Sequence, residues 1–231
     1  MFAAVVAGRF ARTRRPAFAV WTIGLLIFSA AAAFQAAGEA NGFSQVTFRG
    51  FYLLGGVLGV IYLALGTIFL LAPRRVAWVC AAILAAVTVI LAVDAAVIPV
   101  DTAQLTKASG VLGGAIQSGT VLFIGVVFLN IIGTVVLVAG SAWSAYRFWR
   151  DHAGLDRVVC NVLLTAGALV IAYAFSAAKT LGISLSVLGA YEAVGIALMF
   201  GGFLSLGRVG RRSVAPSSAG APVGAGRGVH T

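Results

Sequence analysis

Four polar side chains lie in or beside long apolar stretches of this sequence, and their chemical types make them candidates for function. Asp94 lies within "ILAVDAAVIPVD" (90–101), Asn130 and Glu192 lie inside two later apolar stretches, and Lys179 follows the end of another. An ionisable side chain in an apolar segment is costly and is therefore a functional candidate. In this interpretation Asp94 and Glu192 bind a cation, a proton or an amine, and Asn130 contacts a substrate.

A structural interpretation of the same residues is also open. Asp94 or Glu192 pairs with Lys179 and fixes the order of the helices. The other acid then reaches water or is protonated, because an unpaired buried carboxylate is neutralised rather than left charged. Asn130 then forms an interhelical hydrogen bond. The partners expected for it are Tyr62, Thr67 and Tyr173.

The sequence contains no recognisable catalytic or metal-binding motif. Patterns of the HExxH, GxSxG, CxxC and Walker types are all missing, and the two histidines, His152 and His230, lie outside the apolar stretches. Cys80 and Cys160 have no histidine near them in the sequence, so we interpret them as packing residues rather than metal ligands. We therefore expect no metal and no cofactor, and an enzyme is the least favoured class of function.

The composition indicates a protein that crosses a membrane several times. Of the 231 residues, 61% are hydrophobic and 10% are charged, and the mean hydropathy is +1.06. Soluble domains usually contain about 25% charged residues. The apolar residues come in blocks of about twenty, the length that crosses roughly 30 Å of hydrocarbon as a helix.

These blocks predict an all-α bundle of six membrane-spanning helices. The predicted helices are 17–37, 51–72, 76–98, 120–143, 158–178 and 186–206. Pro99 ends the third helix, because a proline disfavours helical backbone at the residue before it. The domains are then a basic N-terminus (1–16), a transmembrane domain (17–206) and a disordered basic tail (207–231).

The distribution of positive charge predicts that both termini are cytoplasmic. In this threading, thirteen of the sixteen Lys and Arg residues fall on one side, and only Arg49, Lys107 and Lys179 fall on the other. Loops rich in Lys and Arg stay in the cytoplasm. The net charge of +10 therefore reflects topology rather than a nucleic-acid surface. Together with the compositional bias toward Arg, Ala, Val and Gly, this distribution of positive charge points to the inner membrane of a bacterium.

Two features of the threading leave alternatives open. The connector 103–119 is rich in glycine and is either an outer loop or a re-entrant segment, which must line a cavity because irregular backbone cannot face lipid. "LGTIFLL" (65–71) and "IGTVVLV" (132–138) resemble each other. Either the second and third helices are a duplicate of the fourth and fifth, or, as we favour, these apolar segments match by chance.

Small residues at helical spacing predict how the helices pack. Membrane helices associate through close contact, which glycine and alanine permit. Such residues recur on one face of three of the predicted helices. They are Ser29, Ala33 and Ala37 in the first, Gly55, Gly59 and Gly66 in the second, and Gly125, Gly133 and Gly140 in the fourth.

These observations predict a non-enzymatic accessory, scaffold or sensor subunit of a membrane assembly. Its partners are the lipid bilayer and either another membrane protein or a second copy of the chain. The alternative is a small carrier or substrate-binding membrane module, coupled to a cation or a proton, that uses Asp94, Lys179, Glu192 and Asn130.

Overall fold

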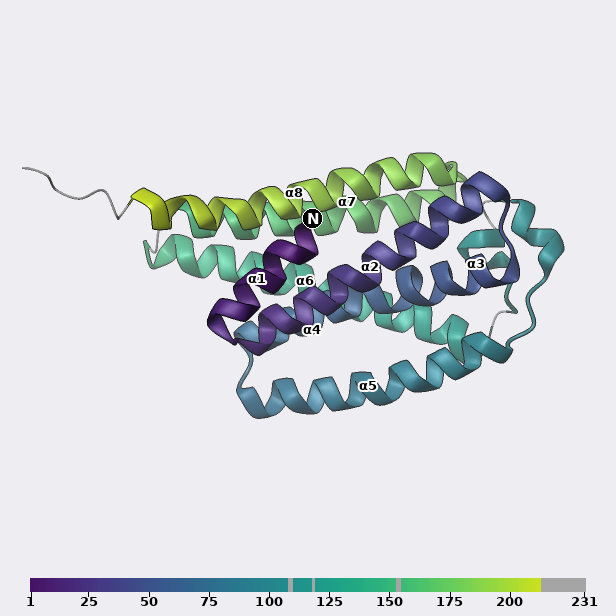
Figure 1. Cartoon of the computed structure of the whole chain (residues 1–231), viewed down its shortest axis with the longest axis horizontal. Helices are drawn as coiled ribbons and strands as arrows, with labels where there is room; N and C mark the ends of the chain where they lie inside the picture. The colour runs from purple at the N-terminus through teal and green to yellow at the C-terminus, as the bar shows by residue number, and fades with distance from the viewer. Residues whose placement is uncertain (108–109, 118, 153–154, 213–231) are drawn as a thin grey trace, which may run out of the picture.

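A computed structural model describes residues 1–107, 110–117, 119–152 and 155–212, except for the side chains of residues 110, 179–180 and 206–212. The described residues are 88% helical and form no strand. Within them, six helical segments are long and apolar enough to cross a membrane (Figure 1). These segments are Pro16–Asn41, Gln45–Leu71, Arg74–Val97, Val121–Arg150, Leu155–Ala178 and Leu185–Ser205. The predicted all-α architecture with six such helices is confirmed.

The N-terminal segment is itself a helix, α1 (Phe2–Thr13), which the sequence analysis treated only as a basic terminus. Arg14 ends α1 in the left-handed conformation (φ 53°), and Pro16 begins α2 (Pro16–Asn41) at a position where proline is favoured. Val6 is fully buried, and the guanidinium of Arg9 lies 4.5 Å from the ring centroid of Phe203. The apolar face of α1 is therefore packed against the bundle.

The second membrane-length segment is three helices joined end to end. It comprises α3 (Gln45–Phe51), the π-helix η1 (Tyr52–Gly59) and α4 (Val60–Leu71). It packs against α2 through the predicted glycines: Gly55 faces Ala31, Gly59 faces Phe28 and Gly66 faces Trp21. The prediction for this face is confirmed.

The corresponding prediction for α2 is wrong. Ser29 and Ala33 are exposed, whereas Gly24, Ala31 and Gln35 are buried. Small residues recur so often in this sequence that spacing alone does not identify the packed face.

The helix α5 (Arg74–Val97) stands apart from the other helices along much of its length (Figure 1). Two of its side chains contact the bundle near the middle of the helix. Leu91 packs against Gly125 of α6 (Val121–Arg150), and the hydroxyl of Thr88 lies 3.2 Å from the Tyr62 hydroxyl. Most of its other large apolar side chains are exposed. The pair α4–α5 is therefore much looser than the pair α6–α7, in contrast to what duplicated hairpins would show.

The last two helices, α7 (Leu155–Leu181) and α8 (Leu185–Arg212), form the closest helix pair. A Cβ at Gly167 would overlap the carbonyl oxygen of Gly195, and a Cβ at Gly202 would lie 2.8 Å from the carbonyl oxygen of Cys160. These glycines bring the two backbones into direct contact. The helix α8 also continues to Arg212, beyond the predicted end of the sixth helix at 206, and 213–231 lie outside the described residues.

The connector between α5 and α6 folds over the end of the bundle. It contains a 3₁₀ turn, η2 (Thr102–Thr106), and a short π-type turn, η3 (Gly110–Gly114). Leu105, Val111 and Ile116 are buried in one cluster with Phe48 and Tyr52. In its described part the connector therefore packs on the end of the bundle through these apolar side chains, while Asp101 and Lys107 are exposed.

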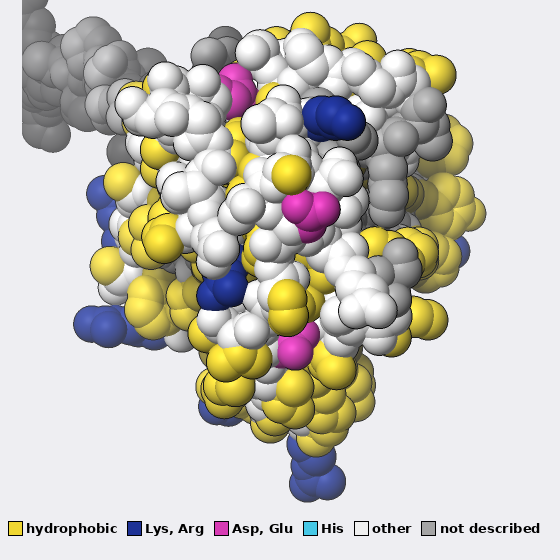
Figure 2. All heavy atoms as spheres, turned by 90° about the vertical axis from the view of Figure 1, so that its right-hand side faces the viewer, with side chains coloured by type: hydrophobic (Ala, Val, Ile, Leu, Met, Phe, Trp, Pro, Cys, Tyr) yellow, Lys and Arg dark blue, Asp and Glu magenta, His cyan; other side chains and the backbone are white. Residues whose placement is uncertain are grey.

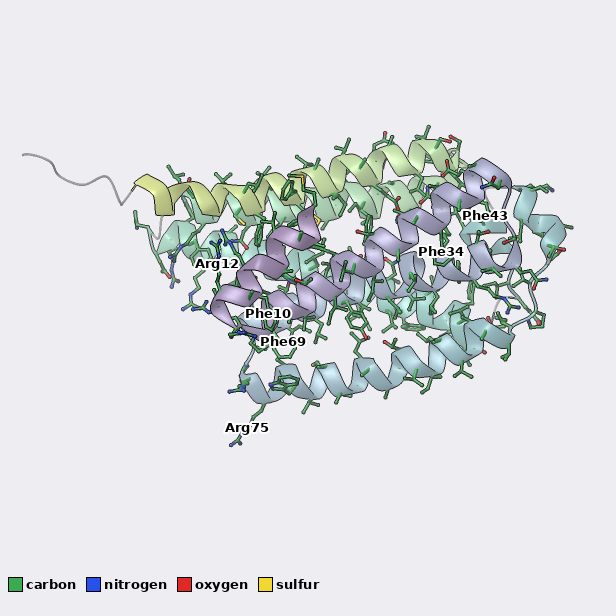
Figure 3. All side chains as sticks on the ribbon, viewed as in Figure 1. Phe10, Arg12, Phe34, Phe43, Phe69 and Arg75 are labelled. Carbon is green, nitrogen blue, oxygen red and sulfur yellow. The ribbon has the colours of Figure 1, made fainter. Side chains whose placement is uncertain are left out.

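The two ends of the bundle differ in charge. Arg12 and Arg75 project from the end that carries α1 and the α4–α5 turn (Figure 3). At the same end, the rings of Trp143, Tyr146 and Trp149 follow one another along α6, with centroids 6.0 and 6.4 Å apart. The opposite end, where the connector lies, carries only scattered charged side chains (Figure 2).

Candidate functional site

Asp94 binds the beginning of a neighbouring helix. Its Oδ2 accepts a hydrogen bond of 2.8 Å from the backbone N–H of Leu122, in the first turn of α6. Thr120, the residue before α6, accepts from the N–H of Phe123. The first N–H groups of a helix have no partner within the helix and carry partial positive charge. The acid near the end of α5 therefore satisfies the start of α6.

This geometry predicts different effects of two substitutions at Asp94. Asp94→Ala removes the acceptor and should lower the free energy of unfolding by about 1–2 kcal/mol, whereas Asp94→Asn keeps an acceptor and should lose much less. Thermal unfolding in detergent micelles measures both. If Asn proves as harmful as Ala, the charge rather than the cap is what matters, and an ion pair regains support.

Arg49, at the same end, binds the end of a helix. Its guanidinium donates to the carbonyl oxygens of Ala96 and of Ile98, the latter at 2.8 Å, where α5 finishes. The carbonyl groups of the last turn are unpaired and carry partial negative charge. The sequence analysis counted Arg49 only as a charge on the outer side. No sequence signal indicated that it would meet α5.

Glu39 completes the pattern at the start of α8. Its carboxylate accepts from the Ser186 hydroxyl at 3.1 Å and from the Gln35 amide at 2.9 Å. The same Gln35 amide nitrogen donates to the carbonyl oxygen of Leu185 at 3.2 Å. A carboxylate beside a helix N-terminus is stabilised by the helix dipole. Three charged residues near this end therefore form hydrogen bonds at helix termini: Glu39, Arg49 and Asp94.

Glu192 differs from these residues. Its side chain is 7% exposed in the second turn of α8, and it forms no hydrogen bond with the residues that the structure describes. The structure does not bring it to Asp94, since α5 and α8 lie on opposite sides of the bundle (Figure 1). The side chain of Lys179, near the end of α7, lies outside the described residues. A pair between Lys179 and Glu192 therefore stays a prediction.

Asn130 has a different partner from those that the sequence analysis expected. Its side-chain amide donates a 2.9 Å hydrogen bond to the backbone carbonyl of Gly56, in the π-helix η1. Tyr62 instead lies beside Thr88, and Thr67 donates to the carbonyl of Leu63. At Gly56, which has no side chain, the backbone carbonyl is accessible to the Asn130 side chain on α6. A search for partners among polar side chains does not find such a backbone group.

A groove of about 380 Å³ lies around Asn130. Its floor is the junction of α3 and η1, one wall is α6 and the other is α7, with Leu112 of the connector at one end. The lining residues on the three helical elements are Phe51, Tyr52, Gly56, Val126, Val127, Asn130, Ile131, Thr134, Val135, Ala172, Phe175 and Ser176. This size falls in the range of small-molecule sites, which are mostly apolar with a few polar groups.

A second, much smaller void lies next to the groove. Beyond Asn130 and Thr134 the next void measures about 20 Å³ and is lined by side chains such as Phe28, Leu137 and Met199. A void of that size holds about one water molecule.

The described residues contain no group of three side chains with the chemistry to hold a metal ion. Cys80 and Cys160 are both free thiols; Cys160 is buried and Cys80 is partly buried. No known protein family matches this sequence, and searches of curated proteins and of solved structures find no significant match. The geometry of the groove is therefore the basis for assigning a function.

Proposed function

We propose that this chain is a multipass membrane protein that binds a small molecule in the groove around Asn130, without transforming it chemically. The observation that carries the proposal is the groove itself, with a volume of about 380 Å³ and a polar amide in an otherwise largely apolar lining. A well-formed apolar pocket with a few polar groups is the usual form of a ligand site.

Two properties of the groove support binding. The floor includes a π-helix, a feature that occurs frequently at functional sites. The side-chain amide of Asn130 donates one N–H to the backbone carbonyl of Gly56. Its side-chain oxygen accepts no hydrogen bond from any residue in the described ranges. An amide that is fixed on one side and has an acceptor left is well placed to orient a ligand.

The membrane and the orientation are part of the same proposal. We place the protein in a bacterial inner membrane with both termini in the cytoplasm. The support is the gathering of arginines at one end of the bundle, among them Arg12 and Arg75 (Figure 3), since positive loops are retained in the cytoplasm. The groove then lies in the outer half of the bilayer.

A second candidate is an accessory subunit of a membrane assembly. The observation that favours it is α5, which contacts the other helices along a narrow strip and exposes Ile83, Ile90 and Val93. In this candidate function a helix of another membrane protein packs beside α5. The binding module remains the preferred function because the groove has specific chemistry, whereas lipid also covers exposed apolar side chains.

One experiment tests both candidates: native mass spectrometry of the protein extracted gently from its own host. We expect a lone chain that retains a small molecule, and we expect Asn130→Leu to weaken retention about tenfold, the equivalent of one hydrogen bond of roughly 1.4 kcal/mol. Asn161→Leu is the matched control, because Asn161 does not line the groove and its side chain donates only within its own helix.

The possible outcomes separate the candidates. Equal retention by the Asn130 and Asn161 variants would show that the molecule lies elsewhere, and the groove proposal would be wrong. A stoichiometric partner protein, with no small molecule bound, would favour the accessory subunit.

A further inference from the structure

The groove opens to the side of the bundle, between α6 and α7. Ile131 and Val135 of α6 are 58% and 59% exposed, and Ser176 of α7 is also exposed. The floor residues Phe51 and Tyr52 are buried. All five line the groove. Its mouth therefore lies on the lateral surface of the helices, which lipid chains surround in a membrane.

The end of the groove nearest the connector is covered. Leu112 of η3 lines the groove, and its neighbour Val111 is buried against the cluster around Tyr52. Gly113 lies so close that a Cβ there would be 3.0 Å from the Tyr52 hydroxyl oxygen, and its φ of 122° suits glycine. The connector thus separates the groove from the aqueous side.

The polar groups of the groove are neutral. None of the described residues that line it carries a charge. A charged ligand would lose its hydration without gaining a counter-ion, which is strongly unfavourable. The hydroxyls of Tyr52 and Thr134 form no hydrogen bond with a residue in the described part of the chain, and Asn130 retains an acceptor. These groups suit a ligand that carries a hydroxyl or a carbonyl.

We propose that the ligand is an uncharged, single-chain amphiphile dissolved in the bilayer, which enters sideways between α6 and α7 and places its hydroxyl or carbonyl group at Asn130. This inference rests on the proposed binding function and adds the chemical class of the ligand and its route. Both follow from the lateral mouth, the covered end and the neutral lining.

The test uses purified full-length protein in lipid nanodiscs and a photoactivatable long-chain alcohol that carries a diazirine on its chain. Crosslinked peptides are mapped by mass spectrometry. We expect labelling at the groove, about tenfold weaker in Ile131→Trp because an indole fills the mouth. Ile132→Trp is the matched control: this neighbour is similarly exposed but does not line the groove. Probes with a carboxylate or trimethylammonium group in place of the hydroxyl should label weakly.

Each failure has a different meaning. Equal labelling by the charged probes would overturn the ligand class. If Ile131→Trp labels like Ile132→Trp while Asn130→Leu still abolishes labelling, the lateral route is wrong and the binding function stands. If Asn130→Leu labels like the unmodified protein, the binding function itself fails.

Discussion

Gly167→Val should unfold at a much lower temperature than the unmodified protein. A side chain at this position would overlap the carbonyl oxygen of Gly195 and the Met199 side chain. A carbonyl that belongs to a helix backbone cannot rotate away as a side chain can, so α7 and α8 must separate. Overpacking costs about 1–3 kcal/mol when side chains can adjust, and we expect at least the upper part of that range here.

The matched control for this experiment is Gly201→Val on α8. A Cβ at Gly201 would meet nothing within 4 Å, so this variant changes the same residue type without a clash. Unfolding can be followed by reaction of the buried Cys160 with a thiol-reactive dye. If the two variants unfold at the same temperature, the close approach of α7 and α8 at Gly167 is contradicted.

Arg49→Met should release the end of α5 that meets the connector. The substitution keeps a long side chain but removes both hydrogen bonds to the carbonyls of Ala96 and Ile98. Hydrogen bonds from a charged donor contribute about 1.5–3 kcal/mol each, so the loss of two lowers the free energy of unfolding by about 3–6 kcal/mol. The effect should be large because α5 has few other contacts with the bundle.

Hydrogen exchange provides the local measurement for Arg49→Met. Amides in the second half of α5 should exchange faster in the variant, while those of α7 and α8 should change little. Lys107→Met removes an exposed charge from the same end and should leave α5 unchanged. Unchanged exchange in α5 after Arg49→Met would mean that other contacts hold this helix in place.

The architecture was predictable because it depends on the length of the apolar runs. A run of about twenty apolar residues must form its backbone hydrogen bonds internally, and a helix achieves this whatever its neighbours are. Helix α1 was not predicted, since its apolar residues occupy one face of a short basic segment. Which small residues are buried was predictable only in part: Gly55 and Gly133 face other helices, whereas Ser29 faces outward.

The candidate site was less predictable for a related reason. The sequence identified Asp94 and Asn130 as polar residues that need partners, and each of them has one. Both partners are backbone groups, on Leu122 and Gly56, and every residue of the chain has such groups. A sequence-based search that considered only side chains as partners therefore could not find these two backbone groups. The groove arises where α3, η1, η3, α6 and α7 meet, and no one of these elements has a sequence pattern that predicts it.

The contacts of Glu39, Arg49 and Asp94 also set an order for biosynthesis. Each of these charges meets a helix end that is made later: Asp94 waits 28 residues for Leu122, Arg49 waits 47 for Ala96 and Glu39 waits 147 for Ser186. At about 5–20 residues per second, the wait for Ser186 lasts roughly 7–30 s. Glu39 therefore stays without its final partner until the start of α8 has been synthesised, later than the partners of Asp94 and Arg49.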